Sequence, residues 1–452
     1  MTELKKREIM KKIIFIFCFL SSGLLIFSPA FADEIIDENA MFSSKDTVVD
    51  VAKTPNKQVA ENTTTFSGEV KYININTQTD KNLDDTSDSK TAKISNYMLG
   101  NFFVDIRKKD GVKAFVNIQA YNLSKDTSTA STVVALKEFF MDFNSQNKIY
   151  FRAGKQVLQW GRCYLWNPTD FVNIDKQTFL SRIGYREGVN GIKMQIPFGT
   201  KYNFYSFLNF TNANEFSEQG VASKFEFLVK NTEMAFSVFT KKGYYSGYGY
   251  DFSTRLCKID IYGETTLSEG DNSYQLQVQN GTLNKYRNGG DWVSKSSIGL
   301  NKNFDSPNFN DRYSVRTEFF YNSNGYSDNI FKDKTVYNYS APITVNGTTK
   351  TSGTKADFVN DANIYDPNYN SKYYAAIFTN MNRFILSDMT LNLNFINNLS
   401  DYSHITSIGV SYTNLNDFTI GLTLNSYGGE PDAEYTYSKD KLMTQLTIGL
   451  SF

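Results

Sequence analysis

The sequence has 452 residues, with 47 Lys and Arg against 47 Asp and Glu, so its formal net charge at pH 7 is zero. A balance this even argues against a nucleic-acid partner and against a polybasic segment that binds a membrane surface. Three cysteines in a chain of this length are too few for a disulfide-built scaffold.

The first 32 residues have the pattern of a secretory signal peptide. Basic residues lie at positions 5–12, an apolar run follows at 13–27, and Ala30-Phe31-Ala32 forms a small-x-small cleavage site. The alternative, a retained signal anchor, is disfavoured because the run is shorter than the about 20 apolar residues of a spanning helix. Removing the signal leaves 42 basic and 45 acidic residues, a net charge of −3.

Residues 33–65 are polar and acidic without periodicity, and we expect a periplasmic lead-in that need not be ordered. No later apolar run approaches the length of a spanning helix, whereas the chain holds 29 Tyr, 37 Phe and only 8 Pro. These features leave two classes of fold, a soluble secreted β protein and a membrane β-barrel.

From Phe66 onward the chain divides into segments of roughly ten residues that alternate between apolar and polar positions, the pattern of outer-membrane barrel strands. We predict an all-β fold, a transmembrane antiparallel β-barrel of about eighteen strands in one domain, residues 66–452. The predicted strands are 66–76, 96–107, 111–122, 132–143, 147–157, 187–197, 201–211, 222–230, 232–241, 247–254, 258–266, 293–303, 312–322, 371–380, 388–396, 402–413, 416–425 and 441–452. Residues 381–401 and 274–278 are ambiguous, so sixteen and twenty strands remain alternatives.

The connections between these segments alternate between long and short. Short connections such as 108–110 and 144–146 are interleaved with long ones such as 158–186 and 323–370. In outer-membrane barrels the short turns face the periplasm and the long loops face outward. An even strand count also returns the C-terminus to the end at which the barrel begins.

The C-terminal strand has a regular period of two. Leu442, Leu446, Ile448, Leu450 and Phe452 occupy even positions, and the odd positions are mostly polar or small. A closed barrel pairs such a strand with the first one and leaves no exposed edge. A last strand that ends in Phe452 resembles the closing strand of bacterial outer-membrane barrels, where this residue is part of the assembly signal. A soluble β-sandwich has the same period, so alternation by itself does not separate the two folds.

The third long loop has a distinctive sequence, LQWGRCYLWNPTD at 158–170, followed by Arg186-Glu187-Gly188. The motifs Trp160-Gly161 and Trp166-Asn167-Pro168-Thr169-Asp170, together with Glu318-Phe319-Phe320-Tyr321-Asn322, resemble a group of Gram-negative outer-membrane barrels of the porin type. The third extracellular loop of porins often folds into the lumen, and the resemblance implies the same for 158–186. Asn-Pro-Thr-Asp is also a turn sequence, because Pro168 fixes φ and the flanking Asn and Asp side chains bond nearby backbone groups.

The candidate constriction consists of aromatic, polar and charged residues of this loop: Trp160, Arg162, Trp166, Asn167, Asp170, Arg182, Arg186 and Glu187. In one interpretation the charged members set selectivity; in the other, these residues only pin the loop. Strand parity also places charges of both signs on the inner face: Arg107, Lys113, Arg152, Lys193, Asp260, Glu264, Arg312, Arg316 and Glu318. Interior charges commonly pair across strands, and rings of one sign would be needed for strong ion selectivity. The mixed signs therefore predict a weak ion preference.

The sequence does not support an enzyme. The single histidine, His404, lies on the outward parity of its strand, without a nucleophile in reach on the same face. Outer-membrane phospholipases carry a His-x-Ser pair on one strand, and the corresponding residues here are His404-Ile405-Thr406. Metal-ligand and phosphate-loop motifs are also missing from the sequence, so we expect neither a metal nor a cofactor.

We expect a porin-like channel for passive diffusion of small hydrophilic solutes, located in the bacterial outer membrane after the signal peptide is removed. The alternative is a surface-exposed structural or adhesive protein whose long loops bind partners. The expected partners are outer-membrane lipids, the barrel-assembly machinery through Phe452, and small hydrophilic solutes. Cys163 and Cys257 fall at opposite ends of the predicted barrel, and we expect them to remain unpaired.

Overall fold

The structure is a computed structural model, and it describes residues 62–80, 90–125, 131–172, 188–306, 309–345, 347–414, 417–438 and 440–452. The predicted signal peptide and nearly all of the predicted lead-in lie outside these residues, as do Arg182, Arg186 and Glu187. Within the described ranges, no helix combines the length and the apolar character needed to cross a membrane.

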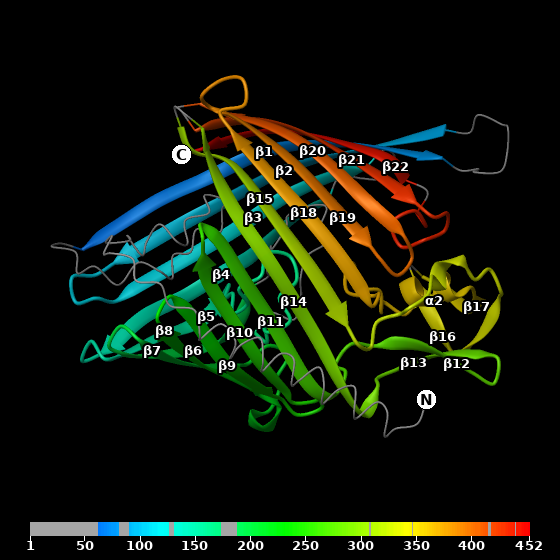
Figure 1. The fold of residues 1–452 in the computed structure, drawn as a ribbon, viewed down its shortest axis with the longest axis horizontal. Coiled ribbons are helices and arrows are strands. Elements are labelled where there is room, and N and C mark those ends of the chain that lie inside the picture. The colour runs from blue at the N-terminus through cyan, green and yellow to red at the C-terminus, as the bar shows by residue number, and fades with distance from the viewer. Residues whose placement is uncertain are drawn as a thin grey trace. The chain divides into compact units, whose positions relative to one another are not determined.

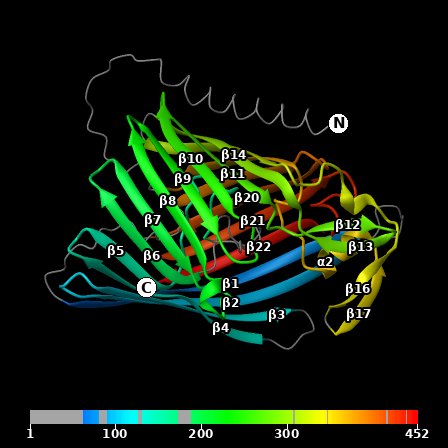
Figure 2. The ribbon, with the colours of Figure 1, turned by 90° about the horizontal axis from the view of Figure 1, so that it is seen from below.

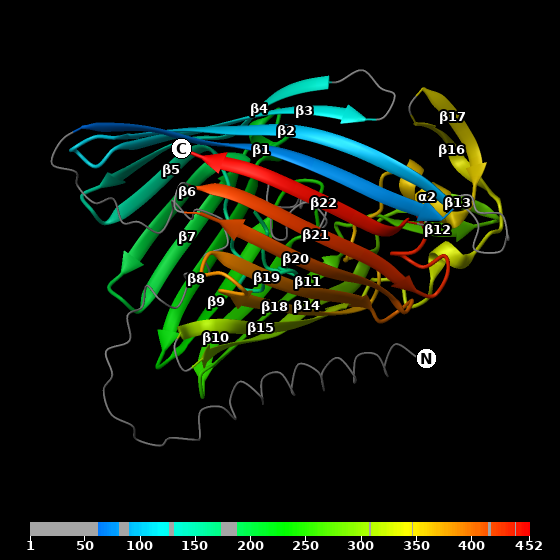
Figure 3. The same cartoon turned by 90° about the horizontal axis from the view of Figure 1, so that it is seen from above.

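Eighteen strands of the described chain form one antiparallel sheet that closes on itself (Figure 1). The last strand lies beside the first, with Ile448 opposite Tyr72 (Figure 3). The barrel strands are β1 (Thr63–Asp80), β2 (Lys90–Arg107), β3 (Lys113–Lys125), β4 (Ser131–Ser145), β5 (Ile149–Gln156), β6 (Val189–Phe198), β7 (Tyr202–Asn209), β8 (Gly220–Val229), β9 (Thr232–Thr240), β10 (Gly247–Leu256), β11 (Ile259–Gly270), β14 (Gly289–Ser306), β15 (Phe309–Asn322), β18 (Tyr373–Asn382), β19 (Met389–Asn398), β20 (Ser403–Thr413), β21 (Phe418–Gly429) and β22 (Asp440–Ser451). Each one overlaps a predicted strand, so the predicted fold class and strand number are confirmed.

The two faces of the barrel wall differ in polarity. On the outer face Phe236, Ile298 and Leu422 have exposed fractions of 56%, 46% and 45%. The opposite parity carries polar residues such as Ser297 and Asn425, which are buried. A soluble β-sandwich buries its apolar face in a core, so the exposed apolar band and the closed sheet exclude that alternative. The polar face is therefore the inner face.

Closure extends to the final residue. The amide of Phe452 donates to the Gly68 carbonyl at 2.9 Å, and the amide of Gly68 donates to the Phe452 carbonyl at 2.8 Å. The ring of Phe452 covers Gly68, since a Cβ there would lie 2.8 Å from Cζ of that ring. The terminal aromatic therefore completes the pairing of β22 with β1.

The hairpin of β1 and β2 is longer than the sequence pattern predicts. Pairing continues from Thr77 opposite Lys93 to Thr79 opposite Thr91, beyond the predicted end at residue 76. These residues have no apolar face, so hydrophobic periodicity gives no signal for them. The backbone ladder between the two strands nevertheless continues.

A second, four-stranded sheet comes from two connections that the sequence analysis treated mainly as loops (Figure 1). It contains β12 (Gln275–Gln279), β13 (Thr282–Tyr286), β16 (Tyr337–Val345) and β17 (Thr348–Gly353), with the helix α2 (Lys355–Asp361) and the short 3-10 helix η3 (Ile330–Lys332) nearby. Another 3-10 helix, η2 (Phe216–Glu218), lies between β7 and β8. The ambiguous piece 274–278 therefore belongs to this second sheet, and it adds no strand to the barrel.

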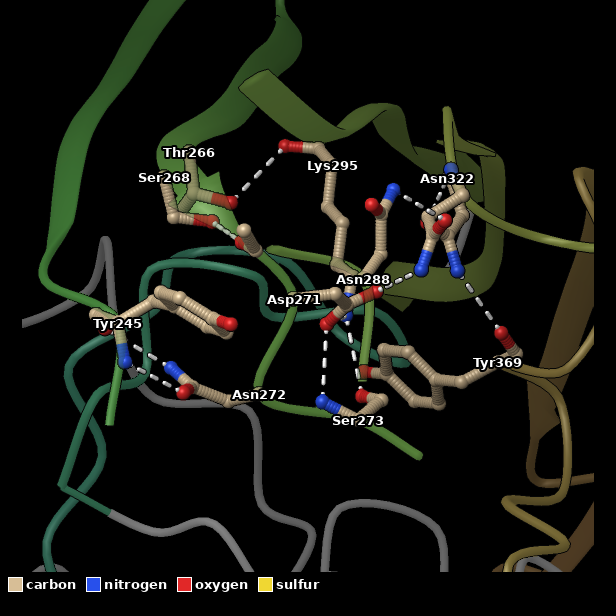
Figure 4. Close-up of polar contacts among 12 residues, drawn as sticks. Tyr245, Thr266, Ser268, Asp271, Asn272, Ser273, Asn288, Lys295, Asn322 and Tyr369 are labelled. Carbon is tan, nitrogen blue, oxygen red and sulfur yellow. Dashed lines mark hydrogen bonds and ion pairs between the residues drawn. The ribbon is translucent and has the colours of Figure 1, made fainter. Parts of the chain in front are cut away.

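The second sheet has its own small core of Leu276, Leu283, Tyr339, Phe358, Val359 and Ile364. Asp271 connects it to the barrel (Figure 4): its carboxylate binds Nζ of Lys295 on β14 at 2.9 Å and accepts from the Ser273 amide at 2.9 Å. Although burial opposes ionisation, Lys295 and the Ser273 amide hold the pKa of Asp271 below its usual value. The loop-derived sheet is thus held to the wall by a buried ion pair.

Candidate functional site

The candidate site is built around residues 157–172, which we call the inner segment. It follows β5 and contains neither a helix nor a strand. Its polar contacts include inward-facing residues of β8, β10, β11 and β15, and β8 to β11 lie side by side (Figure 2). The inner segment therefore lies against the inner face of the wall, as the porin resemblance implies for this loop.

Two buried glutamates hold the backbone of the inner segment. Glu264 on β11 accepts from the amides of Arg162 at 2.5 Å and Cys163 at 2.6 Å through Oε1. Its Oε2 accepts from the amide of Thr169 at 3.0 Å and from the Thr169 hydroxyl at 2.7 Å. One carboxylate thus joins both ends of an eight-residue stretch.

Glu318 on β15 binds the residues between those two ends. Its carboxylate accepts from the Tyr164 amide, from the Leu165 amide at 2.8 Å and from the Trp166 amide at 3.4 Å. An irregular segment leaves its amides without helix or strand partners, and leaving a buried donor unpaired costs about 1–3 kcal/mol. Ionised acceptors make stronger hydrogen bonds than neutral ones, which suits carboxylates to this task.

The position of these glutamates changes one part of the sequence interpretation. Glu264 and Glu318 were predicted to line the pore, and both do point inward, but each is 3% exposed. The inner segment covers them. The two carboxylates accept hydrogen bonds from the backbone of the segment and do not face the lumen. The irregular backbone needs these acceptors, because it has no helix or strand partners of its own.

Aromatic residues pin the inner segment at two places. Trp166 is fully buried, stacks on Phe320 with 5.7 Å between ring centroids, and donates from Nε1 to the Asn368 carbonyl at 2.8 Å. Trp160 packs in a separate cluster with Phe207 and Phe239 from β7 and β9. These two clusters anchor the segment to different parts of the wall.

The predicted Asn-Pro-Thr-Asp turn is present. The Asp170 amide donates to the Asn167 carbonyl at 3.1 Å, which closes a four-residue turn with Pro168 at its second position. A Cβ on Gly161 would lie 2.3 Å from Oδ1 of Asn167 and 2.7 Å from Oε1 of Glu264. Only glycine fits there, so Gly161 and Asn167 pack against each other although five residues separate them in the sequence. Asn167 and Asp170 are buried at 2% and 6% exposure.

Arg162 is the centre of a charge network. Its guanidinium binds Asp251 on β10, Glu233 on β9 at 2.5 Å and Glu226 on β8 at 3.5 Å. Burial by itself would lower the pKa of Arg162, but the three carboxylates outweigh burial and raise the pKa above its ordinary value. The arginine therefore stays charged while its charge is balanced locally.

Lys224 is the second cation of this network. Its Nζ lies 3.1 Å from Oε1 of Glu226 and 3.2 Å from Oδ2 of Asp251, and it donates to the Trp160 carbonyl at 2.8 Å. Neither Lys224 nor Asp251 was among the predicted site residues. Strand parity places both on the inner face, but no sequence signal links them to a loop arginine far away in the chain.

Most of the remaining predicted lining residues form ion pairs on the inner wall. Arg152 binds Asp142 at 2.6 Å with its guanidinium 3.9 Å from the Phe140 ring centroid. The other pairs are Arg107 with Asp105 at 2.9 Å, Lys113 with Asp105 at 3.4 Å, and Arg255 with Asp260 at 2.5 Å. The pairing expected for interior charges is therefore present.

Three predicted lining cations have other surroundings. Arg316 lies over the ring of Tyr164 at 4.2 Å, so the inner segment covers one face of its guanidinium. Arg312 donates to the Arg383 carbonyl at 3.4 Å, near a turn. Lys193 is half-buried opposite Arg152 on the neighbouring strand.

A buried carboxylate behind Trp166 was not predicted. Glu434, in the connection between β21 and β22, accepts from the Tyr374 hydroxyl at 2.7 Å, from Nδ2 of Asn398 at 2.7 Å and from the Asn368 amide at 3.1 Å. Complete burial raises the pKa of Glu434 to about 7. Asn368 joins this group to the inner segment, because its carbonyl accepts from Trp166.

No protein-family model matches the sequence, and no curated protein is significantly similar to it. Solved structures with a similar arrangement of strands include proteins of Pseudomonas aeruginosa, among them the outer membrane protein OprD. OprD is 10% identical with a TM-score of 0.46, covering 86% of this chain and 95% of its own. OccK2 in complex with glucuronate is 8% identical with a TM-score of 0.49, covering 86% and 98%. OccK11 is 7% identical with a TM-score of 0.48, covering 86% and 96%.

Proposed function

We propose that this protein is a channel of the bacterial outer membrane through which small hydrophilic solutes diffuse passively. The observation that carries the proposal is the closed eighteen-stranded sheet with an apolar outer face and a polar inner face. Barrels of sixteen to eighteen strands enclose an aqueous channel, because side chains from the wall no longer fill the interior. An apolar outer band matches lipid, so the wall has the polarity of a membrane protein.

The loop 158–186 is the constriction in this proposal. The described residues Trp160, Trp166, Asn167 and Asp170 are buried and hold the loop in place, which supports the pinning interpretation for them. Arg162 fits both the pinning interpretation and the selectivity interpretation. Carboxylates anchor its guanidinium, and its side chain is still 12% exposed. Arg182, Arg186 and Glu187 keep their predicted role in selectivity as part of the proposal.

The proposed orientation follows from the lengths of the connections. Short turns such as 257–258 face the periplasm, and the second sheet, formed from long connections, faces the exterior. The chain reaches the membrane after cleavage of residues 1–32, and Phe452 presents the assembly signal to the barrel-assembly machinery. The exposed apolar band contacts outer-membrane lipids.

Purified protein in planar lipid bilayers tests the channel directly. Stepwise conductance increases are expected as single barrels insert, with a size that grows in proportion to bulk salt conductivity. Insertion without current would refute the channel, and boiled protein controls for detergent artefacts.

One observation favours a second function. The second sheet has its own core and stands on the barrel end that we propose to be extracellular, so it presents a folded surface to partners. A structural or adhesive protein of this kind needs no open lumen. The bilayer measurement separates the two functions, because a barrel occluded by its own loops passes no current.

A further inference from the structure

Four successive strands of the barrel contain no Lys, Arg, Asp or Glu. They are β18, β19, β20 and β21, and their one titratable imidazole, His404, has the outward parity of Ile408. Elsewhere in the wall only β7 lacks these residues, and it stands between charged neighbours, whereas β8, β10, β11 and β15 all carry inward charges. The inner face of the barrel is therefore divided into a charged part and an uncharged part.

The uncharged part is a regular array of amide and hydroxyl side chains. One row consists of Asn380, Asn392, Gly409, Thr423 and Gln445, and each of these residues lies opposite the next one on the neighbouring strand. A second row, two residues along, consists of Asn382, Thr390, Ser411, Gly421 and Thr447. A third contains Asn394, Ser407 and Asn425, and it ends on the apolar residues Phe378 of β18 and Met443 of β22. The three rows span about 13 Å along the strands.

These side chains have accessible surface on the inner side. Asn392, Asn394, Thr423, Gln445 and Thr447 are half-buried, in contrast to Glu264 and Glu318 beneath the inner segment. Gly421 leaves additional room, because a Cβ there would approach no atom closer than 3.9 Å. The inner segment reaches this part of the wall through Tyr164, whose ring packs against Phe378 of β18 with 4.9 Å between centroids.

The charges elsewhere on the inner wall are largely balanced by neighbours. Arg152 pairs with Asp142, and Arg162 has three carboxylate partners. A charged solute that leaves water gains little from charges already paired, and the amide rows offer it no counterion. A neutral solute with many hydroxyl groups exchanges its water hydrogen bonds for those of Asn, Gln, Ser and Thr, which both donate and accept.

We propose that the amide and hydroxyl rows of β18 to β22 form a binding track for uncharged, polyhydroxylated small solutes such as monosaccharides. The inference rests on the proposed channel function and specifies its substrate class. The track supplies many exchangeable hydrogen bonds in place of one strong site, so a solute moves from row to row without being held.

The test uses three probes of similar size that differ in charge: glucose, gluconate and glucosamine. Each is loaded as a radiolabelled tracer into liposomes that hold the full-length protein, with the membrane potential clamped at zero. The expected glucose efflux exceeds that of each charged probe by about threefold, the effect expected from a difference of about one weak hydrogen bond. Equal efflux rates for the three probes, or faster efflux of a charged probe, would overturn the proposed track but would be consistent with the proposed channel function. If no probe leaves these liposomes faster than it leaves liposomes without the protein, the proposed channel function is refuted, and the proposed track is refuted with it.

Variants locate the effect on the wall. Asn392→Asp is nearly isosteric and places one negative charge in the middle row, so the glucosamine-to-glucose ratio should rise about threefold and the gluconate ratio should fall. Gly421→Asp should do the same from the neighbouring row, which guards against a folding defect in one variant. The matched control is Asn212→Asp, the same substitution in an exposed turn where φ is 58°. A control that shifts the ratios as much as Asn392→Asp would contradict the assignment to β18–β22.

Discussion

The carboxylate of Glu318 accepts a hydrogen bond from the backbone amide of Leu165 at 2.8 Å across 153 positions of sequence. Together with Glu264 it supplies the acceptors for six backbone amides of the inner segment. The conformation of this segment therefore depends on two strand residues more than on its own sequence. Changing these carboxylates is the most direct way to release the loop while leaving the barrel intact.

We predict that Glu318→Gln raises single-channel conductance and lowers the thermal stability of the inner segment. The amide nitrogen of Gln would face backbone donors, because the carboxylate now accepts from Tyr164 and Leu165 through different oxygens. The expected loss is roughly 2 kcal/mol of local stability, the value of hydrogen bonds to a charged acceptor. Bilayer conductance and amide hydrogen exchange at 164–166 measure the two effects.

Asp260→Asn is the control for this change. Asp260 also faces inward, but its partners Arg255 and Asn301 belong to the wall strands β10 and β14. Its conductance should remain near that of the unmodified protein. A Glu318→Gln barrel that folds normally and conducts like the original would refute a constricting role for the segment.

The predicted weak ion preference depends on which cations have carboxylate partners. Arg162→Gln removes a cation from among three carboxylates, so the channel should become more cation-selective, at a cost of about 3–5 kcal/mol for the buried charges left behind. Arg316→Gln should also shift selectivity toward cations but cost less stability, because Arg316 contacts a tyrosine ring in place of a carboxylate. Reversal potentials in a salt gradient measure the ion selectivity of each variant, and thermal melts measure its loss of stability. Strong selectivity of the unmodified channel for either ion would contradict the balance inferred from the paired wall.

The strands were predictable from the sequence because each one carries its own signal. A strand such as Phe418–Gly429 faces lipid on one side and the interior on the other, so its own residues alternate with a period of two. The tight turns between strands add a second local signal. Pairing of neighbours and closure follow from these elements by the rules for antiparallel barrels.

The site was predictable only in part. The tryptophans and the Asn-Pro turn identified the loop, but the partners of Arg162 come from three strands, and nothing near them in sequence indicates that they bind a loop. The second sheet was missed for a related reason: Leu283 and Tyr339 share a core but come from two different connections, and the strand of Leu283 has only five residues, too few to show a period. Glu434 was missed because an isolated glutamate in a polar connection has no signature of burial.

Glu434 predicts a dependence of local stability on pH. Its folded-state pKa is about 7 against an ordinary value of 4.5, so between these values the folded state binds more protons than the unfolded state. Stability of this region is therefore greatest below about pH 4.5 and falls as pH rises through 7, by an amount on the order of 3 kcal/mol. Hydrogen exchange of the Asn368 amide, which donates to Glu434, should be slower at pH 5 than at pH 8 after correction for intrinsic rates.

The matched variant for this measurement is Glu434→Gln. It removes the titrating group and should flatten the corrected pH dependence at residue 368. Asp401, which accepts from the Glu434 amide at 2.7 Å, remains as the nearest carboxylate in that variant. A pH dependence that persists unchanged in Glu434→Gln would assign the effect to another group.

The two cysteines of the described chain provide a chemical test of the loop position. Both are free; Cys163 is buried at 1% exposure and Cys257 is exposed in the turn between β10 and β11. Burial and the nearby carboxylates of Glu264 and Glu318 raise the pKa of the Cys163 thiol well above its ordinary value. Because the thiolate is the reactive form, Cys163 should be inert in the native protein although its loop is extracellular in our proposal.

We therefore predict that a membrane-impermeant maleimide labels Cys257 but not Cys163 in detergent-purified protein at pH 7.5. In intact cells neither should react with a maleimide joined to a polymer too large to pass the proposed channel, since Cys257 faces the periplasm in the proposed orientation. Glu318→Gln should make Cys163 reactive, because it frees the adjacent amides of Tyr164 and Leu165, whereas Asp260→Asn should leave it protected. Peptide mass spectrometry assigns each label. Rapid labelling of Cys163 in the unmodified protein would show that the inner segment is not held against the wall, and labelling of Cys257 on intact cells would reverse the orientation.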